Sequence, residues 1–452
     1  MRIKQISVSG LFGIFDHVIP LNMDERITII HGPNGFGKTA ILRILNALFN
    51  SQYAELKTIP FKLFRLAFDD SSNIEIIKNN DDSEQAKNNI VLKFSQPDSE
   101  PVHFYLKSKI NQDNRELRSI YLNYYIKSIK TPLKSLDLGT EETLLPEKAS
   151  EEAVEEVDNL WSSIWRSQEE PDWLEQLKSN IHIRLIESQR LLNFVPNRSS
   201  RRSAETPSIL STVSAYSDEL AKLMQDKFKE YGIISQSLDR TFPIRVVKQQ
   251  PSTDLTDEQL RHQLNELEAT RSRLIEVGLL DKDEDAEFQI QPQDIDESTK
   301  NALSVYVQDV EKKLSVFAEI ASKIDLLRKI INNKFAYSYK EINFSKEKGF
   351  VVTTSYGSSL SNSKTLLPTD LSSGEQHELV LLYELLFKVQ PNSLVLIDEP
   401  ELSLHVGWQV QFLKDLQDIT QLADLNILMA THSPDIIQDR WDLTVELKGP
   451  QK

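Results

Sequence analysis

Residues 32–39 have the sequence GPNGFGKT and match the pattern GxxxxGK[ST] at every fixed position. An Ile-rich segment precedes them at 26–30, and apolar residues at helical spacing follow them at 41–49. A glycine-rich turn between a buried strand and a helix lets backbone N–H groups converge on an anion at the helix N-terminus. The segment therefore predicts a phosphate-binding loop. A chance glycine turn is the alternative, and the flanking elements disfavour it.

The side chains of this loop have distinct expected roles. The ammonium of Lys38 is expected to reach the β- and γ-phosphates of a nucleotide, and the hydroxyl of Thr39 to ligate Mg²⁺. Glycines are needed at the other fixed positions because a side chain there would obstruct the phosphates. The predicted nucleotide-binding residues are Gly32, Pro33, Asn34, Gly35, Phe36, Gly37, Lys38, Thr39 and Ala40.

An apolar segment at 393–397 ends in two adjacent carboxylates, Asp398 and Glu399. A buried strand that ends in this way places Asp398 near the Mg²⁺ ion and Glu399 toward an attacking water molecule. An acidic loop that merely follows a strand is the alternative. The phosphate loop elsewhere in the chain favours the catalytic interpretation.

Two polar segments lie on either side of this strand in the sequence. The segment LSSGE at 371–375 opens a Leu-rich helix, and Ser372 suits its N-cap. On local evidence alone, helix capping explains Ser372 at least as well as a functional role. The segment Thr431-His432-Ser433 ends the next predicted strand, where a single histidine is usually only a polar turn residue.

Composition limits the other classes of function. The chain has 452 residues, a formal net charge of −16 and no cysteine. Disulfide scaffolds, cysteine-based zinc sites and thiol nucleophiles are therefore excluded. The acidic balance argues against a surface that binds nucleic acid throughout, although a local basic stripe remains compatible. We expect a cytoplasmic protein with no membrane partner, because no apolar run is long enough to cross a bilayer.

The middle of the chain has a different periodicity. Apolar residues recur at heptad spacing in 260–274 and again in 303–324, with an acidic linker around 281–297. This pattern predicts an antiparallel helical hairpin, with one helix over roughly 298–334, inserted into a globular body. The predicted domains are 1–250 and 336–452, which form the body, and a helical insertion over 251–335. We expect residues 253–335 to be replaceable by a linker without loss of the hydrolytic machinery.

Taken in order, the motifs resemble those of an ABC-type ATPase head, of the branch that includes SMC, RecF-like and OLD-like ATPases. LSSGE resembles the family's signature motif, usually LSGGQ, with Ser373 and Glu375 as departures. The resemblance implies that Ser372 and Gly374 contact the γ-phosphate bound by the opposite subunit. It also implies that His432 is the switch histidine. His405 stands where the family usually has the aspartate of its D-loop.

One further residue is identified through the same resemblance. Gln189 follows the alternating segment 181–186 and resembles the Q-loop glutamine, which senses Mg²⁺ and water. A solvent-facing glutamine is the alternative. The residues expected around the metal are then Thr39, Gln189 and Asp398, and those expected to be catalytic are Glu399, His432 and Lys38.

The resemblance implies an α/β fold and an ATP-hydrolysing function with ATP and Mg²⁺ as ligands. The expected architecture is a P-loop ATPase head with a mixed sheet covered by helices on both faces, an antiparallel β lobe and an inserted antiparallel coiled-coil hairpin. Heads of this kind are expected to act as a nucleotide-sandwich dimer or a higher homo-oligomer.

The insertion favours the SMC, RecF and OLD side of the family over transporters. The segments LSSGEQHELVLLYELLF, LVLIDEPELSLH and ATHSPDII are similar to the ATPase subunits of anti-phage systems, namely PARIS (AriA) and Septu or retron–Septu (PtuA). This similarity implies a sensor and scaffold that controls a separately encoded nuclease.

Two other interpretations stay open. One is a RecF- or SMC-like repair ATPase that clamps DNA, which a group of arginines favours: Arg184, Arg190, Arg198, Arg201 and Arg202. The other is a slowly hydrolysing scaffold that holds a partner protein.

Overall fold

The computed structural model describes residues 1–78, 90–97, 99–106, 170–186, 192–193, 210–248, 256–282, 296–355 and 364–450. The chain divides into two compact units. The first comprises residues 1–20, 43–181 and 448–452, and the second comprises residues 21–42 and 182–447. The division into 1–250, 251–335 and 336–452 stays a prediction.

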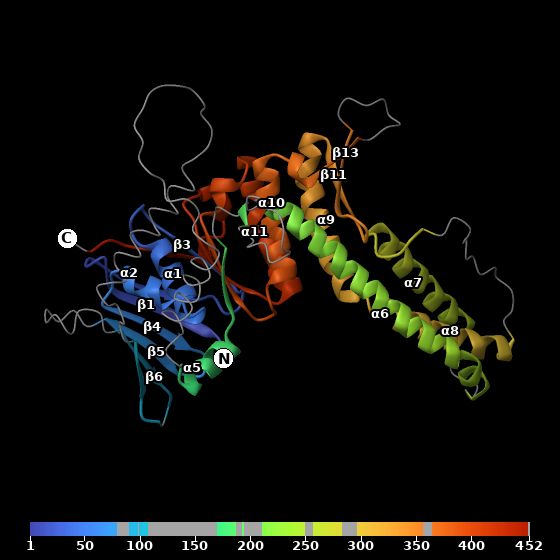
Figure 1. The fold of residues 1–452 in the computed structure, drawn as a ribbon, viewed down its shortest axis with the longest axis horizontal. Helices are drawn as coiled ribbons and strands as arrows, with labels where there is room; N and C mark the ends of the chain where they lie inside the picture. Colours follow the sequence, from blue (N-terminus) through green and yellow to red (C-terminus); the bar gives the residue numbers. More distant parts are fainter. Residues whose placement is uncertain are drawn as a thin grey trace, which may run out of the picture. The chain divides into compact units, whose positions relative to one another are not determined.

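The first unit contains a six-stranded antiparallel sheet in the order β2-β1-β4-β5-β6-β7 (Figure 1). In β1, Ile3, Ile6 and Val8 are buried between more exposed residues, as expected of a strand with one face in the core. Two antiparallel hairpins lie in this sheet, because β2 pairs with β1 and β5 with β4. The elements of this unit are β1 (Ile3–Leu11), β2 (Phe15–Pro20), α2 (Tyr53–Thr58), β4 (Leu63–Phe68), β5 (Asn73–Lys78), β6 (Ile90–Ser95), β7 (Val102–Leu106) and α5 (Asp172–Asn180).

The second unit contains a five-stranded sheet in the order β16-β3-β15-β14-β8, and all its pairings are parallel. Its central strands are nearly continuous apolar runs, because a parallel sheet is buried on both faces. Ala430 on β15 lies level with Ile30 on β3 and with Asp398 on β14. The three strands therefore end at the same edge. Their bounds, with the outer strands, are β3 (Ile27–His31), β8 (Ile183–Ile186), β14 (Leu394–Asp398), β15 (Asn426–Ala430) and β16 (Thr444–Glu446).

A helix follows each of three strands of this sheet. α1 (Lys38–Phe49) follows β3, α11 (Val406–Ala423) follows β14, and α12 (Pro434–Ile437) follows β15. The Leu-rich helix that LSSGE is expected to open is α10 (Ser373–Tyr383), which continues as the π-helix η3 (Glu384–Lys388). The mixed α/β fold class is confirmed. Two short strands, β9 (Leu192–Asn193) and β10 (Leu210–Ser211), pair with each other.

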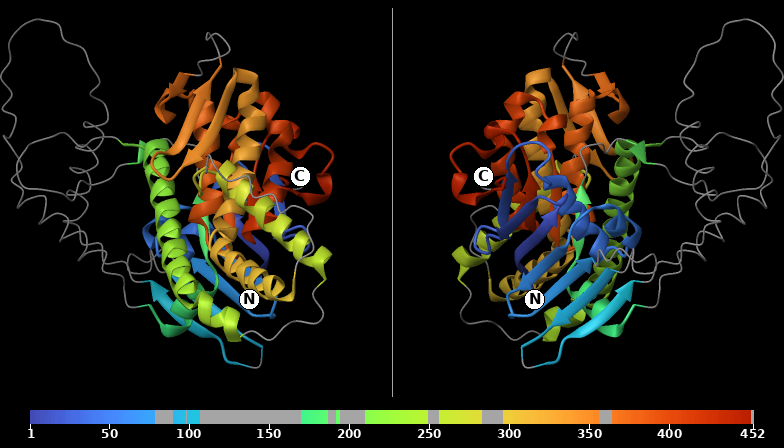
Figure 2. Two further views of the ribbon diagram at one scale, coloured as in Figure 1. Left: turned by 90° about the vertical axis from the view of Figure 1, so that its right-hand side faces the viewer. Right: turned by 90° about the vertical axis from the view of Figure 1, so that its left-hand side faces the viewer.

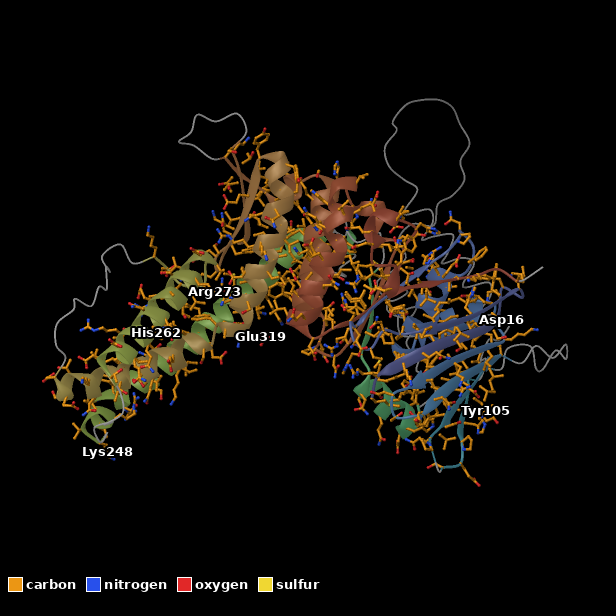
Figure 3. The ribbon with its side chains drawn as sticks, turned by 180° about the vertical axis from the view of Figure 1, so that it is seen from behind. Asp16, Tyr105, Lys248, His262, Arg273 and Glu319 are labelled. Carbon is orange, nitrogen blue, oxygen red and sulfur yellow. The ribbon has the colours of Figure 1, made fainter. Side chains whose placement is uncertain are left out.

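Three helices form what we call the helical arm: α6 (Thr212–Lys248), α7 (Asp257–Glu276) and α8 (Glu297–Ser315). α6 and α8 are antiparallel, because Asp239 pairs with Lys313, and Arg245, further along α6, pairs with Asp309. Figure 3 labels Lys248 at the far end of the arm, with His262 and then Arg273 along α7. α7 therefore starts near the end of the arm where α6 ends, and it runs in the opposite direction to α6.

The two heptad segments pack parallel to each other. The segments 260–274 and 303–324 were expected to pack antiparallel, but α7 and α8 run in the same direction. Asp257 at the start of α7 pairs with Lys300 near the start of α8, and Leu260 and Leu264 form a small cluster with Val307. The antiparallel pair of the arm is α6 with α8.

The single helix expected over 298–334 is also wrong, because it divides at Val316 and Phe317 into α8 and α9 (Ala318–Phe335). The ring of Phe317 is fully buried and lies 5.3 Å from that of Tyr231 on α6. α9 belongs to the main core of the second unit, where Ile324, Ile331 and Phe335 are fully buried. Part of the expected insertion is therefore core.

A three-stranded antiparallel sheet follows α9, in the order β11-β12-β13 (Figure 2). Its strands are β11 (Lys340–Ser345), β12 (Gly349–Thr354) and β13 (Lys364–Leu366). A short turn of helix, η1 (Ala336–Ser338), connects α9 to β11, and η2 (Pro368–Asp370) leads from β13 to α10. Within the ranges that the structure describes, no helix has both the length and the apolar character needed to span a membrane.

Candidate nucleotide-binding site

The segment predicted to be a phosphate loop lies between a strand and a helix, β3 and α1, in the second unit. Gly32, Gly35 and Gly37 all have positive φ angles, of 149°, 83° and 92°. A Cβ atom on Gly32 would lie 2.9 Å from the carbonyl oxygen of Leu447, so a side chain at this position would collide with the backbone beside β16. Pro33, Asn34 and Gly35 are exposed, which leaves the top of the loop accessible to a ligand.

The side chain of Lys38 folds back over the loop. Its Nζ atom donates hydrogen bonds to the carbonyl oxygens of Gly32 at 2.9 Å and Pro33 at 3.2 Å. Burial lowers the pKa of the Lys38 ammonium, and the carboxylates of Glu399 and Asp398 oppose this shift. The buried cation is therefore enclosed by the loop that is expected to bind phosphate.

Thr39 and Asp398 are 359 residues apart in the sequence and meet at this edge of the sheet. The hydroxyl of Thr39 donates a hydrogen bond to Oδ1 of Asp398 at 3.1 Å. One hydroxyl and one carboxylate fit Mg²⁺, which usually takes one or two protein ligands and completes its shell with phosphate and water. Among the residues that the structure describes, no cluster of three or more His, Cys, Asp or Glu side chains could hold a metal ion by itself.

Glu399 and His432 face each other across the ends of β14 and β15. Oε1 of Glu399 lies 3.8 Å from Nε2 of His432, and both side chains are about one third exposed. The backbone of Glu399 is left-handed, with φ of 44°, an uncommon conformation for a residue other than glycine and one that occurs at functional sites. Its N–H donates to the carbonyl oxygen of Ala430, which fixes this turn against β15.

The sequence interpretation missed two residues that hold the histidine segment. The carboxylate of Glu401 accepts hydrogen bonds from the hydroxyl of Thr431 at 2.8 Å and from the backbone N–H of His432 at 2.6 Å. The side chain of Gln409, which is buried on α11, accepts a hydrogen bond from the hydroxyl of Ser433 at 2.6 Å. Neither role could be recognised from the sequence, because the contact of Glu401 depends on the packing of β14 beside β15 and that of Gln409 on the position of α11.

The LSSGE segment forms the start of α10. The Ser372 side chain caps the helix by accepting from the N–H of Glu375, and the Glu375 side chain accepts from the N–H of Ser372 at 2.8 Å. This reciprocal pair is a capping box. Ser372 and Ser373 are exposed, and Gly374 is partly exposed. Helix capping is thus established for Ser372, and its hydroxyl lies at an accessible helix N-terminus.

The other residues singled out in the sequence have these positions. His405 caps α11, because its Nδ1 accepts from the N–H of Gly407 at 3.2 Å. Arg184 lies on β8, 3.5 Å from a carboxylate oxygen of Glu384. Gln189 lies outside the residues that the structure describes, as do four of the five arginines that favoured DNA binding: Arg190, Arg198, Arg201 and Arg202.

Two SMC head domains are among the solved structures to which the chain is similar. The chain is similar over 96% of its length to the Smc head domain with an extended coiled coil, bound to the C-terminal domain of ScpA, from Pyrococcus furiosus, with 14% identity, 90% of that chain covered and a TM-score of 0.30. It is similar over 97% of its length to the SMC head domain from Thermotoga maritima, with 9% identity, 92% of that chain covered and a TM-score of 0.32. No curated protein matches the chain.

The family model described as AAA ATPase domain matches residues 1–437, which include the phosphate loop, Asp398, Glu399 and His432. The chain therefore belongs to the AAA ATPase domain family.

Proposed function

We propose that this chain is an ATP-hydrolysing head that binds ATP and Mg²⁺ and works as a nucleotide-sandwich dimer or higher homo-oligomer. The observation that carries the proposal is the convergence of Lys38, Thr39 with Asp398, and Glu399 with His432 at one edge of the parallel sheet. Ligands bind at the carboxyl ends of the strands in sheets of this kind. A buried lysine, a hydroxyl–carboxylate pair that could ligate Mg²⁺ and a carboxylate that could orient water are groups that catalyse phosphoryl transfer in P-loop NTPases.

Each group has a proposed role in the reaction. Lys38 exchanges its two carbonyl partners for the β- and γ-phosphate oxygens, and the loop's N–H groups cradle the phosphates. Thr39 and Asp398 hold the Mg²⁺ ion, with Gln189 as the further expected ligand. Mg²⁺ supplies charge neutralisation on the transferring phosphoryl group. Glu399 orients the attacking water and accepts its proton, and His432 donates a hydrogen bond to the γ-phosphate.

The position of the signature segment supports the proposed dimer. Ser372 and Gly374 stand at the N-terminus of α10, a helix of 11 residues whose first turn is accessible. A helix N-terminus favours an anion, because its N–H groups and dipole point toward it. We propose that this N-terminus contacts the γ-phosphate held by a second copy, so that ATP joins two heads and hydrolysis releases them.

Two variants test the hydrolytic part. Lys38→Ala is expected to lose most ATP binding, since a charge and donor to the phosphates disappears. Glu399→Gln is expected to keep binding while the rate of hydrolysis falls about 10²-fold, as is usual when a general base is removed. Binding of a fluorescent ATP analogue and phosphate release measure the two effects. If both variants lost nucleotide binding equally, the proposed division of roles would be wrong.

We further propose that the ATPase is the sensor and scaffold of an anti-phage system and controls a partner nuclease. The support is the resemblance of its C-terminal motifs to ATPase subunits of such systems. The test is plaque formation on bacteria that express the chain with its neighbouring genes, with the Lys38→Ala variant as control. Protection that needs Lys38 supports the proposal. ATP-dependent, salt-sensitive DNA binding without protection would favour the DNA clamp instead.

A further inference from the structure

Glu375 is an unusual residue in the first turn of α10, because its carboxylate is buried. Its exposed fraction is only 3%. A buried carboxylate is costly unless hydrogen bonds and an opposite charge compensate it. Glu375 replaces the glutamine of the usual signature motif, which carries no charge. Its surroundings must therefore supply a compensation that a glutamine does not need.

Lys340, the first residue of β11, supplies the opposite charge. Its Nζ atom contacts both carboxylate oxygens of Glu375, Oε1 at 2.9 Å and Oε2 at 2.8 Å. The hydroxyl of Ser338 adds a hydrogen bond to Oε1 at 2.8 Å. Burial raises the pKa of the Glu375 carboxyl, but the hydrogen bonds from Lys340, Ser372 and Ser338 outweigh it and hold the pKa below its usual value.

The compensated carboxylate in turn fixes Ser372. Oε2 of Glu375 accepts hydrogen bonds from both the N–H and the hydroxyl of Ser372, each at 2.8 Å. The contacts form a chain from Lys340 through Glu375 to the exposed serine. A loss of Lys340 would leave Glu375 as a buried anion without its ion-pair partner, which is costly. The carboxylate would then move toward solvent, and the orientation of Ser372 would change with it.

We propose that Lys340 is a positioning residue for ATP-driven pairing of heads: it neutralises Glu375, which then holds Ser372 in place for the nucleotide of the second copy. The inference rests on the proposed dimer and goes beyond it, because Lys340 lies outside the signature motif, at the start of β11. It requires that Lys340 be needed only while residue 375 is charged.

The test is a double-mutant cycle in a Glu399→Gln background, in which unhydrolysed ATP should keep heads paired. Association with ATP and Mg²⁺ is measured by sedimentation velocity. Lys340→Met is expected to weaken association about tenfold or more, because it leaves a buried charge without its partner. Glu375→Gln alone should have a small effect, since the released lysine can reach solvent. The double variant Lys340→Met with Glu375→Gln should recover most of the association, and Lys340→Arg should retain it.

A matched control lies on the same sheet. Lys346, in the turn between β11 and β12, pairs with the exposed carboxylate of Asp281 at 2.6 Å. Lys346→Met should leave association unchanged. Thermal unfolding and binding of a fluorescent ATP analogue to single heads show whether each variant is folded. Should Lys340→Met not fold, Lys340→Gln replaces it in the same cycle.

The outcomes separate the two proposals. If the Glu399→Gln parent does not associate with ATP, the proposed dimer fails and this inference fails with it. If the parent associates and folded Lys340→Met associates equally well, only the role of Lys340 is overturned. The same holds if Glu375→Gln does not rescue Lys340→Met, since the effect of the lysine would then be independent of the charge on residue 375.

Discussion

The carboxylate of Glu401 holds the backbone of His432, whose N–H donates a hydrogen bond of 2.6 Å to Oε1. The other oxygen of Glu401 accepts from the hydroxyl of Thr431. Because His432 follows β15 and Glu401 follows β14, this carboxylate ties together the two strand ends that carry the expected catalytic groups. The position of the imidazole beside Glu399 thus depends on a residue two positions further along the chain.

We therefore predict that Glu401→Ala slows ATP hydrolysis and leaves ATP binding nearly unchanged. A displacement of about 1 Å in a catalytic group can reduce the rate as much as 10²-fold. Glu401→Gln should have a smaller effect, since its amide keeps one acceptor oxygen for the N–H of His432. Phosphate release and analogue binding measure the two quantities. An unchanged rate in Glu401→Ala would show that the strand ends hold His432 without this carboxylate.

A second buried network links three helices around Lys334 of α9. Its ammonium pairs with Glu378 of α10 and, at 2.8 Å, with Asp415 of α11. Burial raises the pKa of the Asp415 carboxyl, and the ion pair with Lys334 opposes this shift without cancelling it. The ionised form of Asp415 is therefore less favourable in the folded protein than in the unfolded chain.

The sign of the pH dependence follows from this shift. A raised pKa contributes stability below the unfolded value, about 3.9 for an aspartate, and this contribution is lost as the pH rises through the folded pKa. The Asp415→Asn variant has no carboxyl group at this position, so its stability does not decrease in this way as the pH rises. We predict that the free energy of unfolding of Asp415→Asn, relative to the wild type, increases as the pH rises from about 4. Urea unfolding at a series of pH values measures it. A difference that stays flat or falls would contradict the prediction.

Glu375→Gln is the matched control for that experiment and has the opposite sign. The pKa of Glu375 is lowered, so its contribution is present above the unfolded pKa and is lost as the pH falls through the folded pKa. The stability of Glu375→Gln relative to the wild type should therefore decrease as the pH rises. If the stability of both variants relative to the wild type changed with pH in the same direction, the opposite pKa shifts of Asp415 and Glu375 would be contradicted.

The division between core and arm gives a prediction about stability. Ile331 on α9 and Leu260 on α7 are both fully buried, but Ile331 belongs to the main core and Leu260 to the small cluster with Leu264 and Val307. Each change to alanine should lower the free energy of unfolding of the region in which the residue packs by about 2–5 kcal/mol. Hydrogen exchange should rise throughout the second unit in Ile331→Ala, and only in α7 and α8 in Leu260→Ala. The same spread of exchange in both variants would refute this division.

The position of α9 in the core also changes the expectation that residues 253–335 can be replaced by a linker. Replacing 253–335 by a linker would remove α9, and with it Ile324, Ile331 and Phe335 of the core. The heptads could not show this, because an apolar seam has the same spacing whether it faces another arm helix or a sheet. The seam also carries no information on direction, so the parallel packing of α7 and α8 could not be predicted. α6 has 37 residues, and its buried residues lie only in its first half, so its sequence has no heptad pattern like those of 260–274 and 303–324.

The site itself was more predictable than the arm. Lys38, Thr39, Asp398 and Glu399 belong to segments in which a buried strand runs into a polar turn, and the ends of parallel strands meet at one edge. A local pattern is therefore sufficient to place them together. Glu401 and the pair of Lys340 with Glu375 depend on which surfaces pack against each other. No spacing in the sequence carries that information.

The last prediction tests the role of Ser372 beyond capping. If Ser372 only caps α10, Ser372→Arg should cost about 1 kcal/mol and leave ATP-driven association intact. If it faces the nucleotide of a second head, the arginine blocks the interface sterically. Because Ser372 is exposed, the larger side chain can extend into solvent in a single head, which should still fold and bind ATP through residues 32–39.

The Glu399→Gln background makes this contrast measurable, because unhydrolysed ATP should hold paired heads together. We predict that Glu399→Gln associates more strongly with ATP and Mg²⁺, and that adding Ser372→Arg abolishes the increase with little change in melting temperature. Ser372→Ala is the matched control: it removes the cap hydroxyl without adding bulk, so it should lower stability by a similar amount and retain more of the association. Sedimentation velocity with and without ATP distinguishes the two. Equal association in Glu399→Gln with and without the arginine would leave Ser372 as a helix cap alone.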